Sequence, residues 1–302
     1  MKLFDLHCDT ALEMYKTKQR YGHNTLCIDK ERTVFDDYKQ VFAIWSENTL
    51  SDDEAYERFF KVVEYLKADS DFPEFIKDNS LSGTALLSVE GANLLAGDIS
   101  RLDKLYENGV RLLTLTWDGI SVIGGAHGTD KGLTDFGRET VEKCFEKHII
   151  VDTSHLSDKG FDDVAEYKKP FVASHSCLRE ISDIPRNIDK KRAARLASSG
   201  GIIGVNFVGY HLDGNYFECG TTSDAIAKQI KAFLNIVGED NLAIGADFDG
   251  TDKLPSDISG IESMEYLYTK LVNSGIKPRI ADKIFFENAY GFLRKNLQEK
   301  ML

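Results

Sequence analysis

The chain has 302 residues, of which 42% are hydrophobic and 28% are charged, and its net charge is −12. This composition is typical of a soluble globular protein that buries a large core, and it argues against disorder. The negative charge argues against nonspecific binding to nucleic acid or to anionic membranes, because both require clusters of lysine and arginine.

The sequence shows no export signal within its first twenty residues and no apolar run long enough to span a membrane, so we expect a cytoplasmic protein. The five cysteines include no C-x-x-C pair. An odd number without that spacing fits reduced thiols better than a disulfide framework or a thiolate zinc site.

Apolar runs rich in β-branched residues alternate along the chain with segments of helical periodicity. The predicted strands are Leu3–His7, Val41–Trp45, Thr84–Glu90, Val110–Thr116, Ile149–Thr153, Pro170–His175, Ile202–Phe207 and Leu242–Asp247. The clearest helices are expected at Asp53–Ala68, Gly137–Lys147, Ile188–Ser198, Ser223–Val237, Ser263–Asn273 and Pro278–Gln298. This alternation predicts right-handed βαβ units and a parallel sheet.

Eight such units predict an α/β fold of the (β/α)8 barrel type. A doubly wound sheet would carry a G-x-G-x-x-G turn after its first strand, and that turn is missing. We interpret residues 1–302 as a single barrel domain, with an enlarged crossover at about 46–83 that includes a second predicted helix at Asp71–Asp78. The glycine-rich stretch Gly119–Gly132 is predicted to be a loop at the barrel mouth.

Polar residues stand at or just beyond the ends of five predicted strands. They are His7, Asp9, Glu90, His155, His175 and Asp247. Because the carboxyl ends of all barrel strands open on one face, we expect these side chains to meet there. His7 and Asp9 are two residues apart and therefore share one face of an extended strand.

Buried histidines and carboxylates in this number would be costly without cations to neutralise them. Two divalent metal ions would solve this problem. Imidazole with carboxylate favours zinc, manganese, iron or cobalt over calcium or magnesium, and zinc is the first expectation. Each residue taken alone could instead have a purely structural role without metal, such as a buried core histidine at His7 or a helix cap at Asp9. His23, His148 and His211 lack the strand-end placement and are interpreted as ordinary histidines.

Nine short motifs occur in series along nearly the whole chain. They are Phe4–Asp9, Val89–Gly91, Leu112–Thr116, Gly132–Gly137, Val151–His155, Ser174–Ser176, Pro185–Asn187, Gly204–Phe207 and Gly245–Gly250. In this order the chain resembles the renal (membrane) dipeptidase family, the M19 metallopeptidases of the amidohydrolase superfamily.

The resemblance implies a zinc-dependent dipeptidase with two zinc ions per chain. It implies that His7 and Asp9 bind one metal, that His155 and His175 bind the other, and that Glu90 bridges them. Asp247 is the implied catalytic residue, which moves a proton to the departing amine after a metal-activated water attacks the amide. Asp249 is the less favoured acid because it lies beyond Asp247 in the turn. The expected partner is a small peptide, with neither nucleic acid nor membrane, and a homodimer is left open.

Three further residues are assigned to substrate binding. Arg186 matches the family arginine that holds the terminal carboxylate, a task that suits a planar guanidinium, although the sequence alone equally allows a solvated loop arginine. Where animal members have a histidine that contacts substrate, this chain has Trp117, which cannot accept a proton. His127, in the same predicted loop, is the available substitute.

The departure at Trp117 leaves the substrate range open. The alternative is another hydrolase on the same scaffold, acting on lactones, cyclic amides or N-acyl amino acids. A binding protein that has lost catalysis would be expected to lack a metal ligand, and all six strand-end groups are present.

Overall fold

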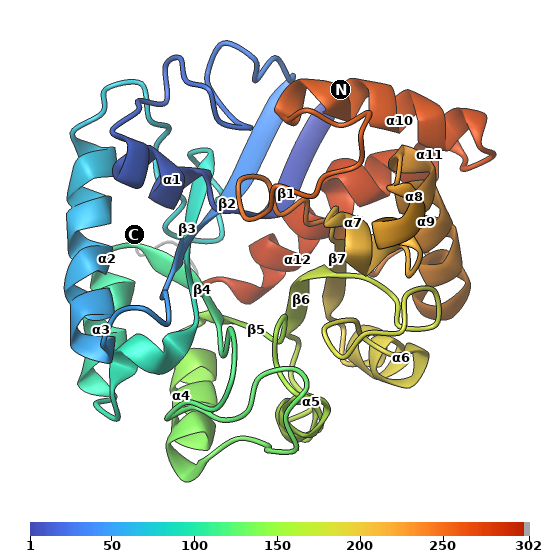
Figure 1. Ribbon diagram of the computed structural model, residues 1–302. Coiled ribbons are helices and arrows are strands. Elements are labelled where there is room, and N and C mark those ends of the chain that lie inside the picture. The colour runs from blue at the N-terminus through green and yellow to red at the C-terminus, as the bar shows by residue number, and fades with distance from the viewer. Residues whose placement is uncertain (299–302) are drawn as a thin grey trace.

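In a computed structural model that describes residues 1–298, eight parallel strands close into a barrel in chain order, with helices around it (Figure 1). The strands are β1 (Lys2–Cys8), β2 (Asp37–Trp45), β3 (Ala85–Glu90), β4 (Val110–Thr114), β5 (Ile150–Asp152), β6 (Val172–Ser176), β7 (Ile202–Val205) and β8 (Leu242–Ile244). The predicted (β/α)8 barrel is therefore confirmed, and every predicted strand overlaps an observed one.

The helices cover the outside of the barrel. They are α1 (Thr10–Thr17), α2 (Asp52–Lys67), α3 (Ser100–Glu107), α4 (Asp135–Glu146), α5 (Asp158–Ala165), α6 (Lys190–Ser198), α7 (Gly209–Leu212), α8 (Tyr216–Cys219), α9 (Ser223–Val237), α10 (Met264–Asn273), α11 (Pro278–Asp282) and α12 (Asn288–Asn296). A π-helical turn, Lys283–Glu287, joins the last two, so the predicted helix at 278–298 is continuous up to Asn296. Within residues 1–298, no helix combines the length and apolar character that crossing a bilayer requires.

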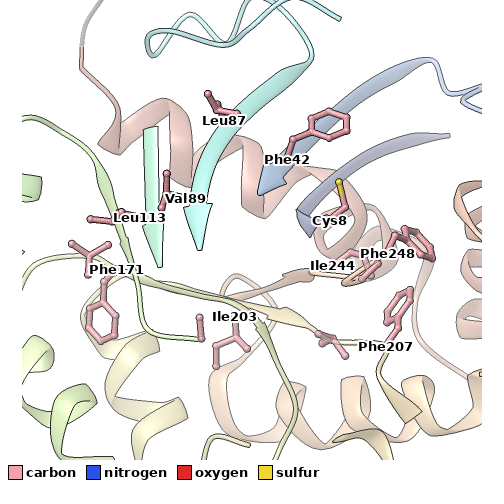
Figure 2. Packing of buried hydrophobic residues seen from close by; sticks show 14 of the residues in the cluster. Cys8, Phe42, Leu87, Val89, Leu113, Phe171, Ile203, Phe207, Ile244 and Phe248 are labelled. Atoms are coloured by element: carbon pink, nitrogen blue, oxygen red, sulfur yellow. The ribbon is translucent and has the colours of Figure 1, made fainter. Parts of the chain in front are cut away.

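Two apolar cores hold the strands in place. The larger lies between the strands and the surrounding helices, and Figure 2 shows part of it, including Phe42, Leu87, Leu113 and Ile203. The smaller includes alternate strand residues such as Leu86 and residues of α12 that pack against them. Burial on both faces explains why the strands read as nearly continuous apolar runs in the sequence.

Register shifts in β1 and β6 interrupt the alternation of side chains between the two faces of the strand. In β1 the shift lies between Asp5 and Cys8, so Leu6 belongs to the smaller core while Cys8 belongs to the larger. In β6 it lies between Ala173 and Ser176. Irregularities of this kind commonly re-aim side chains beside functional sites. Both shifts occur immediately before or around a histidine of the predicted metal set.

The predicted helix at Asp71–Asp78 is wrong. The segment forms no helix, and instead Phe75 forms a bridge to Ala85 and the amide of Ile76 donates to the Ala85 carbonyl at 2.7 Å. Pro73 has no amide hydrogen to continue a helix, so the backbone pairs with the start of β3 instead. The long crossover between β2 and β3 therefore contains α2 followed by irregular chain.

Candidate metal centre

A cavity of about 650 Å³ lies at the carboxyl ends of the strands, and most of the predicted site residues border it. Its lining includes Asp9, Trp45, Glu90, Trp117, His127, His155, Arg186, Tyr210, His211, Asp247, Asp249 and Gly250. The polar strand ends thus meet on one face, as the barrel topology predicts.

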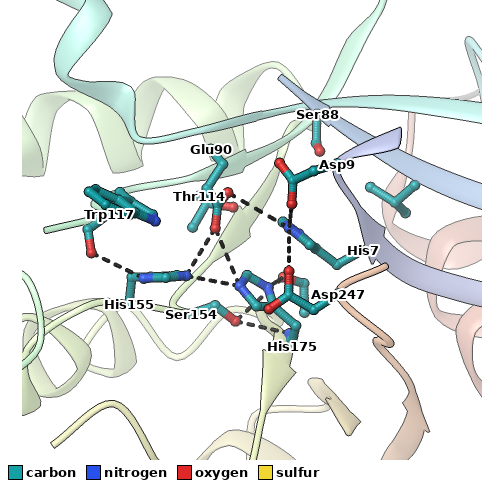
Figure 3. A network of polar contacts seen from close by, with 12 residues as sticks. His7, Asp9, Ser88, Glu90, Thr114, Trp117, Ser154, His155, His175 and Asp247 are labelled. Carbon is teal, nitrogen blue, oxygen red and sulfur yellow. Dashed lines mark hydrogen bonds and ion pairs between the residues drawn. The ribbon is translucent and has the colours of Figure 1, made fainter. Parts of the chain in front are cut away.

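The six predicted strand-end residues converge at the base of this cavity (Figure 3). They form three overlapping groups, each with ligand atoms within 4.8 Å of one another. The groups are His7, Asp9 and Glu90; Glu90, His155 and His175; and His7, His175 and Asp247. All six are buried except His155, which is partly buried.

Glu90 stands between the two sides of the cluster. Its Oε2 lies 3.7 Å from His7 Nε2. Its Oε1 lies 3.0 Å from His155 Nε2 and 3.3 Å from His175 Nε2. Each carboxylate oxygen therefore faces a different set of imidazoles, which is the arrangement that a carboxylate bridging two cations requires. On the first side, Asp9 Oδ2 is 3.4 Å from His7 Nε2.

The hydrogen bonds around two histidines fix which ring nitrogen is free. His155 Nδ1 lies 3.1 Å from the Trp117 carbonyl, which can only accept, so this nitrogen donates. His175 Nδ1 lies 2.8 Å from Ser174 Oγ, whose single proton goes to Asp152 at 2.6 Å, so this nitrogen also donates. Both Nε2 atoms consequently carry lone pairs directed into the cluster, as metal-binding histidines do.

These two lone pairs face each other. His155 Nε2 and His175 Nε2 are 2.9 Å apart, and neither can donate to the other. Among the described residues, both ring nitrogens of His7 and the Oδ1 of Asp9 are buried without a hydrogen-bond partner. A cation beside these atoms would satisfy them, so the donor set fits divalent metal ions.

The electrostatics of the cluster lead to the same conclusion. Burial raises the pKa of Glu90 well above its usual range. Burial also lowers the pKa of His155 and of His175 well below the usual range. At His7 burial acts in the same direction, but the nearby carboxylates of Glu90, Asp9 and Asp247 outweigh it and raise the pKa to about 10. Burial thus disfavours the charged forms of Glu90, His155 and His175, and cations bound among these groups would favour the deprotonated carboxylate and the neutral imidazoles that metal binding requires.

The backbone is strained at two of these positions. His155 and Asp247 have φ values of 67° and 63°, in the left-handed region that residues with a Cβ seldom adopt. Such outliers persist where the surrounding structure enforces them, and they cluster at functional sites. The backbone of Gly250 lies against the carboxylates of Asp247 and Asp9, since a Cβ there would lie 2.2 Å from Asp247 Oδ1 and 2.4 Å from Asp9 Oδ2. Only glycine fits this approach without moving the carboxylates.

The structure places Arg186 in the cavity wall, where its side chain is buried. Its Nη2 donates to the His175 carbonyl at 2.8 Å and its Nη1 to Ser176 Oγ at 3.4 Å. Among residues 1–298, no carboxylate lies within ion-pair distance of this guanidinium, and its Nε has no hydrogen-bond partner. Burial lowers the pKa of Arg186, and the charges of Asp247, Glu90 and Asp152 offset only part of that effect.

Trp117 and His127 both border the cavity, as the sequence predicts for the loop after β4. The His127 ring lies 5.6 Å from that of His155, and its buried Nδ1 has no hydrogen-bond partner in the described chain. Burial, with the charge of Arg186, lowers the pKa of His127. His127 therefore borders the cavity with a ring nitrogen that no described residue satisfies.

Sequence reasoning missed several residues of the site. His211, interpreted as ordinary, borders the cavity with a buried Nδ1 that has no partner within residues 1–298. It lies in α7, beyond the end of β7, so no strand-end signal marks it. Trp45 ends β2, but because it is apolar it does not stand out as a site residue in the sequence. Asn206 donates to Asp247 Oδ2 at 3.0 Å; it lies in one of the nine motifs, but no role is assigned to it from the sequence.

The remaining candidates fall outside the cluster. Asp249 accepts hydrogen bonds from Thr10 Oγ1 at 2.5 Å and from the Cys27 amide at 2.8 Å, so its carboxylate ties three segments of chain together. The side chain of His23 is exposed and pairs with Glu31. His148 contacts a backbone carbonyl near α12.

Curated relatives share the sequence pattern. A protein of Klebsiella pneumoniae described as an uncharacterized protein in the pqqA 5′ region is 31% identical over 222 residues, covering 70% of this chain and 81% of that protein. An uncharacterized dipeptidase of Schizosaccharomyces pombe is 28% identical over 64% of this chain, and the match covers 48% of that longer protein.

Solved structures share the fold. The dipeptidase AC, a metallopeptidase of family M19, superposes with a TM-score of 0.90 at 23% identity, covering 98% of each chain. A Rhodobacter sphaeroides metallopeptidase liganded with a phosphinate mimic of the dipeptide L-Ala-D-Ala gives a TM-score of 0.86 at 22% identity, covering 98% of this chain and 99% of that one. The model of the membrane dipeptidase family, peptidase family M19, matches residues 1–301. The chain therefore belongs to the membrane dipeptidase family of metallopeptidases, peptidase family M19.

Proposed function

We propose that this protein is a dipeptidase that binds two zinc ions and hydrolyses the single amide bond of small dipeptides. The observation that carries the proposal is the presence, in one cavity, of a cation-demanding cluster and a buried arginine without a carboxylate partner. A free dipeptide offers both complements, an amide carbonyl for the metals and a carboxylate for the arginine.

The geometry supports a role for each of the metal ligands. His7 and Asp9 would hold one ion, His155 and His175 the other, and Glu90 would bridge them with its two oxygens. Bound there, the ions would supply a coordinated water of pKa about 7 and would polarise the amide carbonyl. Ser174 and the Trp117 carbonyl keep the ligating nitrogens of His175 and His155 deprotonated.

Asp247 is positioned to move the proton. Asn206 donates to its Oδ2, and its Oδ1 lies 3.8 Å from His7 Nε2 at the base of the cavity. A carboxylate held at this point can accept a proton from the attacking water and deliver it to the departing amine. The strained backbone of Asp247 and the close cover by Gly250 hold that carboxylate in place.

The terminal carboxylate of the substrate would bind Arg186. Of its five N–H donors, only two are used by His175 and Ser176, so a planar carboxylate could take others. The dipeptide mimic bound by the Rhodobacter sphaeroides relative supports a substrate of this size. The cytoplasmic location remains a prediction from the sequence, and a homodimer remains open.

Arg186→Ala is expected to lower kcat/KM for free dipeptides by at least about tenfold, because a hydrogen bond to a charged group contributes about 1.5–3 kcal/mol. Dipeptides with an amidated C-terminus should change little, since they lack the carboxylate. The measurement is kcat/KM for each free and amidated pair. Arg138→Ala, which removes an arginine paired with Asp163, is the control and should change neither.

Equal losses for free and amidated dipeptides would contradict this role of Arg186. That result would favour the alternative hydrolase, which acts on lactones, cyclic amides or N-acyl amino acids. Such substrates should then be cleaved faster than any free dipeptide by the same metal-loaded sample.

A further inference from the structure

An aromatic wall forms one side of the cavity. Trp45 and Trp117 both border it, and their ring centroids are 4.5 Å apart with the planes tilted by 53°. Trp45 is the last residue of β2, and Trp117 follows β4, so two neighbouring parts of the barrel rim contribute one apolar surface. Nothing in the proposed chemistry uses the indole of Trp45.

Trp45 lies across the barrel from the carboxylate anchor, Arg186, and Trp117, which follows β4, stands between these two sides. In a closed barrel of eight strands in sequential order, β2 and β6 are diametrically opposite, and Figure 1 shows them on opposite sides. Arg186 is bonded to His175 and Ser176 at the carboxyl end of β6. The cluster around Glu90, which ends β3, lies at the base of the cavity between these two sides.

The length of a dipeptide then fixes its direction. With its carboxylate on Arg186, the scissile amide is one residue further along, at the metal ligands, because one extended residue spans about 3.3–3.6 Å. The N-terminal residue must continue away from β6, towards β2. A side chain on that residue that follows the same direction would contact the indole of Trp45, against which Trp117 packs.

We propose that Trp45 and Trp117 form the pocket for the side chain of the N-terminal residue, and that this pocket selects dipeptides with a bulky apolar residue there. The inference rests on the proposed dipeptidase function and adds the specificity of one subsite. Trp45 is a specificity-determining residue of this pocket, acting through contact with substrate and not through the metals.

The charges near the wall favour an apolar occupant over a cationic one. Glu13 also borders the cavity, but Lys16 pairs with it at 3.0 Å. The same Lys16 lies 5.3 Å from the centre of the Trp45 ring, in a cation–π contact. Lys16 therefore already pairs with the carboxylate of Glu13 and already makes a cation–π contact with Trp45, which leaves less for a lysine or arginine side chain of the substrate to gain there.

The test compares two isomeric dipeptides, Phe-Gly and Gly-Phe, in the metal-loaded enzyme. The wild-type protein is expected to prefer Phe-Gly, and Trp45→Ala should lower the ratio of kcat/KM for Phe-Gly over Gly-Phe by about tenfold or more. Trp45→Phe, which keeps an aromatic ring, should retain most of the preference. Because both substrates are measured on one sample, the ratio does not depend on the fraction of folded or metal-loaded protein.

If Trp45→Ala does not fold, Trp45→Leu tests the same ratio, with a smaller expected fall of about threefold. An unchanged ratio in a folded variant would overturn the inference about the pocket. The dipeptidase function would still stand in that case, provided that the wild-type protein hydrolyses these dipeptides. A rise in the ratio would place the C-terminal side chain on this wall and also overturn it. A wild-type preference for Lys-Gly over Phe-Gly would make the pocket cationic in selectivity and contradict it. Failure of the wild type to cleave any of these dipeptides would refute the function itself.

Discussion

Asp247→Asn is expected to lower turnover of dipeptides by about 10²- to 10⁴-fold, the usual contribution of general acid–base catalysis, while most of the metal stays bound. The asparagine amide keeps the size of the carboxylate but cannot accept and return a proton at Oδ1. Asp247 belongs to a potential ligand group, yet Glu90 and three imidazoles supply the other donors without it. The measurements are kcat and metal content on one sample.

Asp249→Asn provides the matched control, because the same change is made two residues further along the same turn and beside the same cavity. The Asp249 carboxylate accepts bonds from Thr10 and Cys27 and faces no cluster histidine within ion-pair distance in the described chain. Its replacement should reduce turnover by less than about tenfold, well below the range for a proton-transfer residue. Loss of both metals from Asp247→Asn would show that Asp247 is mainly a ligand.

Glu90→Gln should have the largest effect on the metals themselves. Glu90 has one oxygen 3.7 Å from His7 and the other 3.0 and 3.3 Å from His155 and His175, so its two oxygens face the two sides of the cluster. Removing its charge weakens both metal positions, whereas His7→Asn removes a donor from one side. We therefore expect Glu90→Gln to lose more metal and more activity than His7→Asn, as measured by elemental analysis and kcat.

Equal losses of metal and rate from these two variants would show that Glu90 does not bridge. Both variants should keep the fold, because the barrel cores lie outside the cluster, and circular dichroism of each metal-free protein checks this. A Glu90→Gln protein that kept its full metal content would also contradict the bridging role.

The barrel was predictable because its strands are buried on both faces and stand out as apolar runs. Short surface helices were harder to recognise. α3 and α5 have only 8 residues each, too few for the helical period to stand out from the polar chain around them. The segment at Asp71–Asp78 shows the reverse error, since its apolar residues repeat at helical spacing while Pro73 and the pairing with Ala85 keep the backbone from forming a helix.

The metal cluster was predictable for a topological reason. A barrel brings the ends of distant strands to one face, so His7, Glu90 and His175 could be grouped before any distance was known. The sequence could not show the register shifts in β1 and β6, nor the left-handed backbone at His155 and Asp247, because these depend on tertiary contacts.

The residues that line the walls of the cavity were harder to predict from the sequence. His211 reaches it only because α7 turns back over the barrel mouth after β7, a loop path that local sequence does not specify. Trp45 looks like any apolar residue that ends a strand. Its proposed role depends on its position opposite Arg186, which only the closed barrel defines.

Dipeptide hydrolysis measured together with metal content in one sample tests the central claim most directly. The protein as purified and zinc-loaded should contain about two metal ions per chain, since the cluster offers too many ligands for one tetrahedral ion. Chelation should abolish cleavage of a library of free dipeptides, and added zinc should restore it in step with the bound metal. Dipeptide cleavage that survives removal of all metal, or a fully metal-loaded protein that cleaves none of the library, would contradict the account.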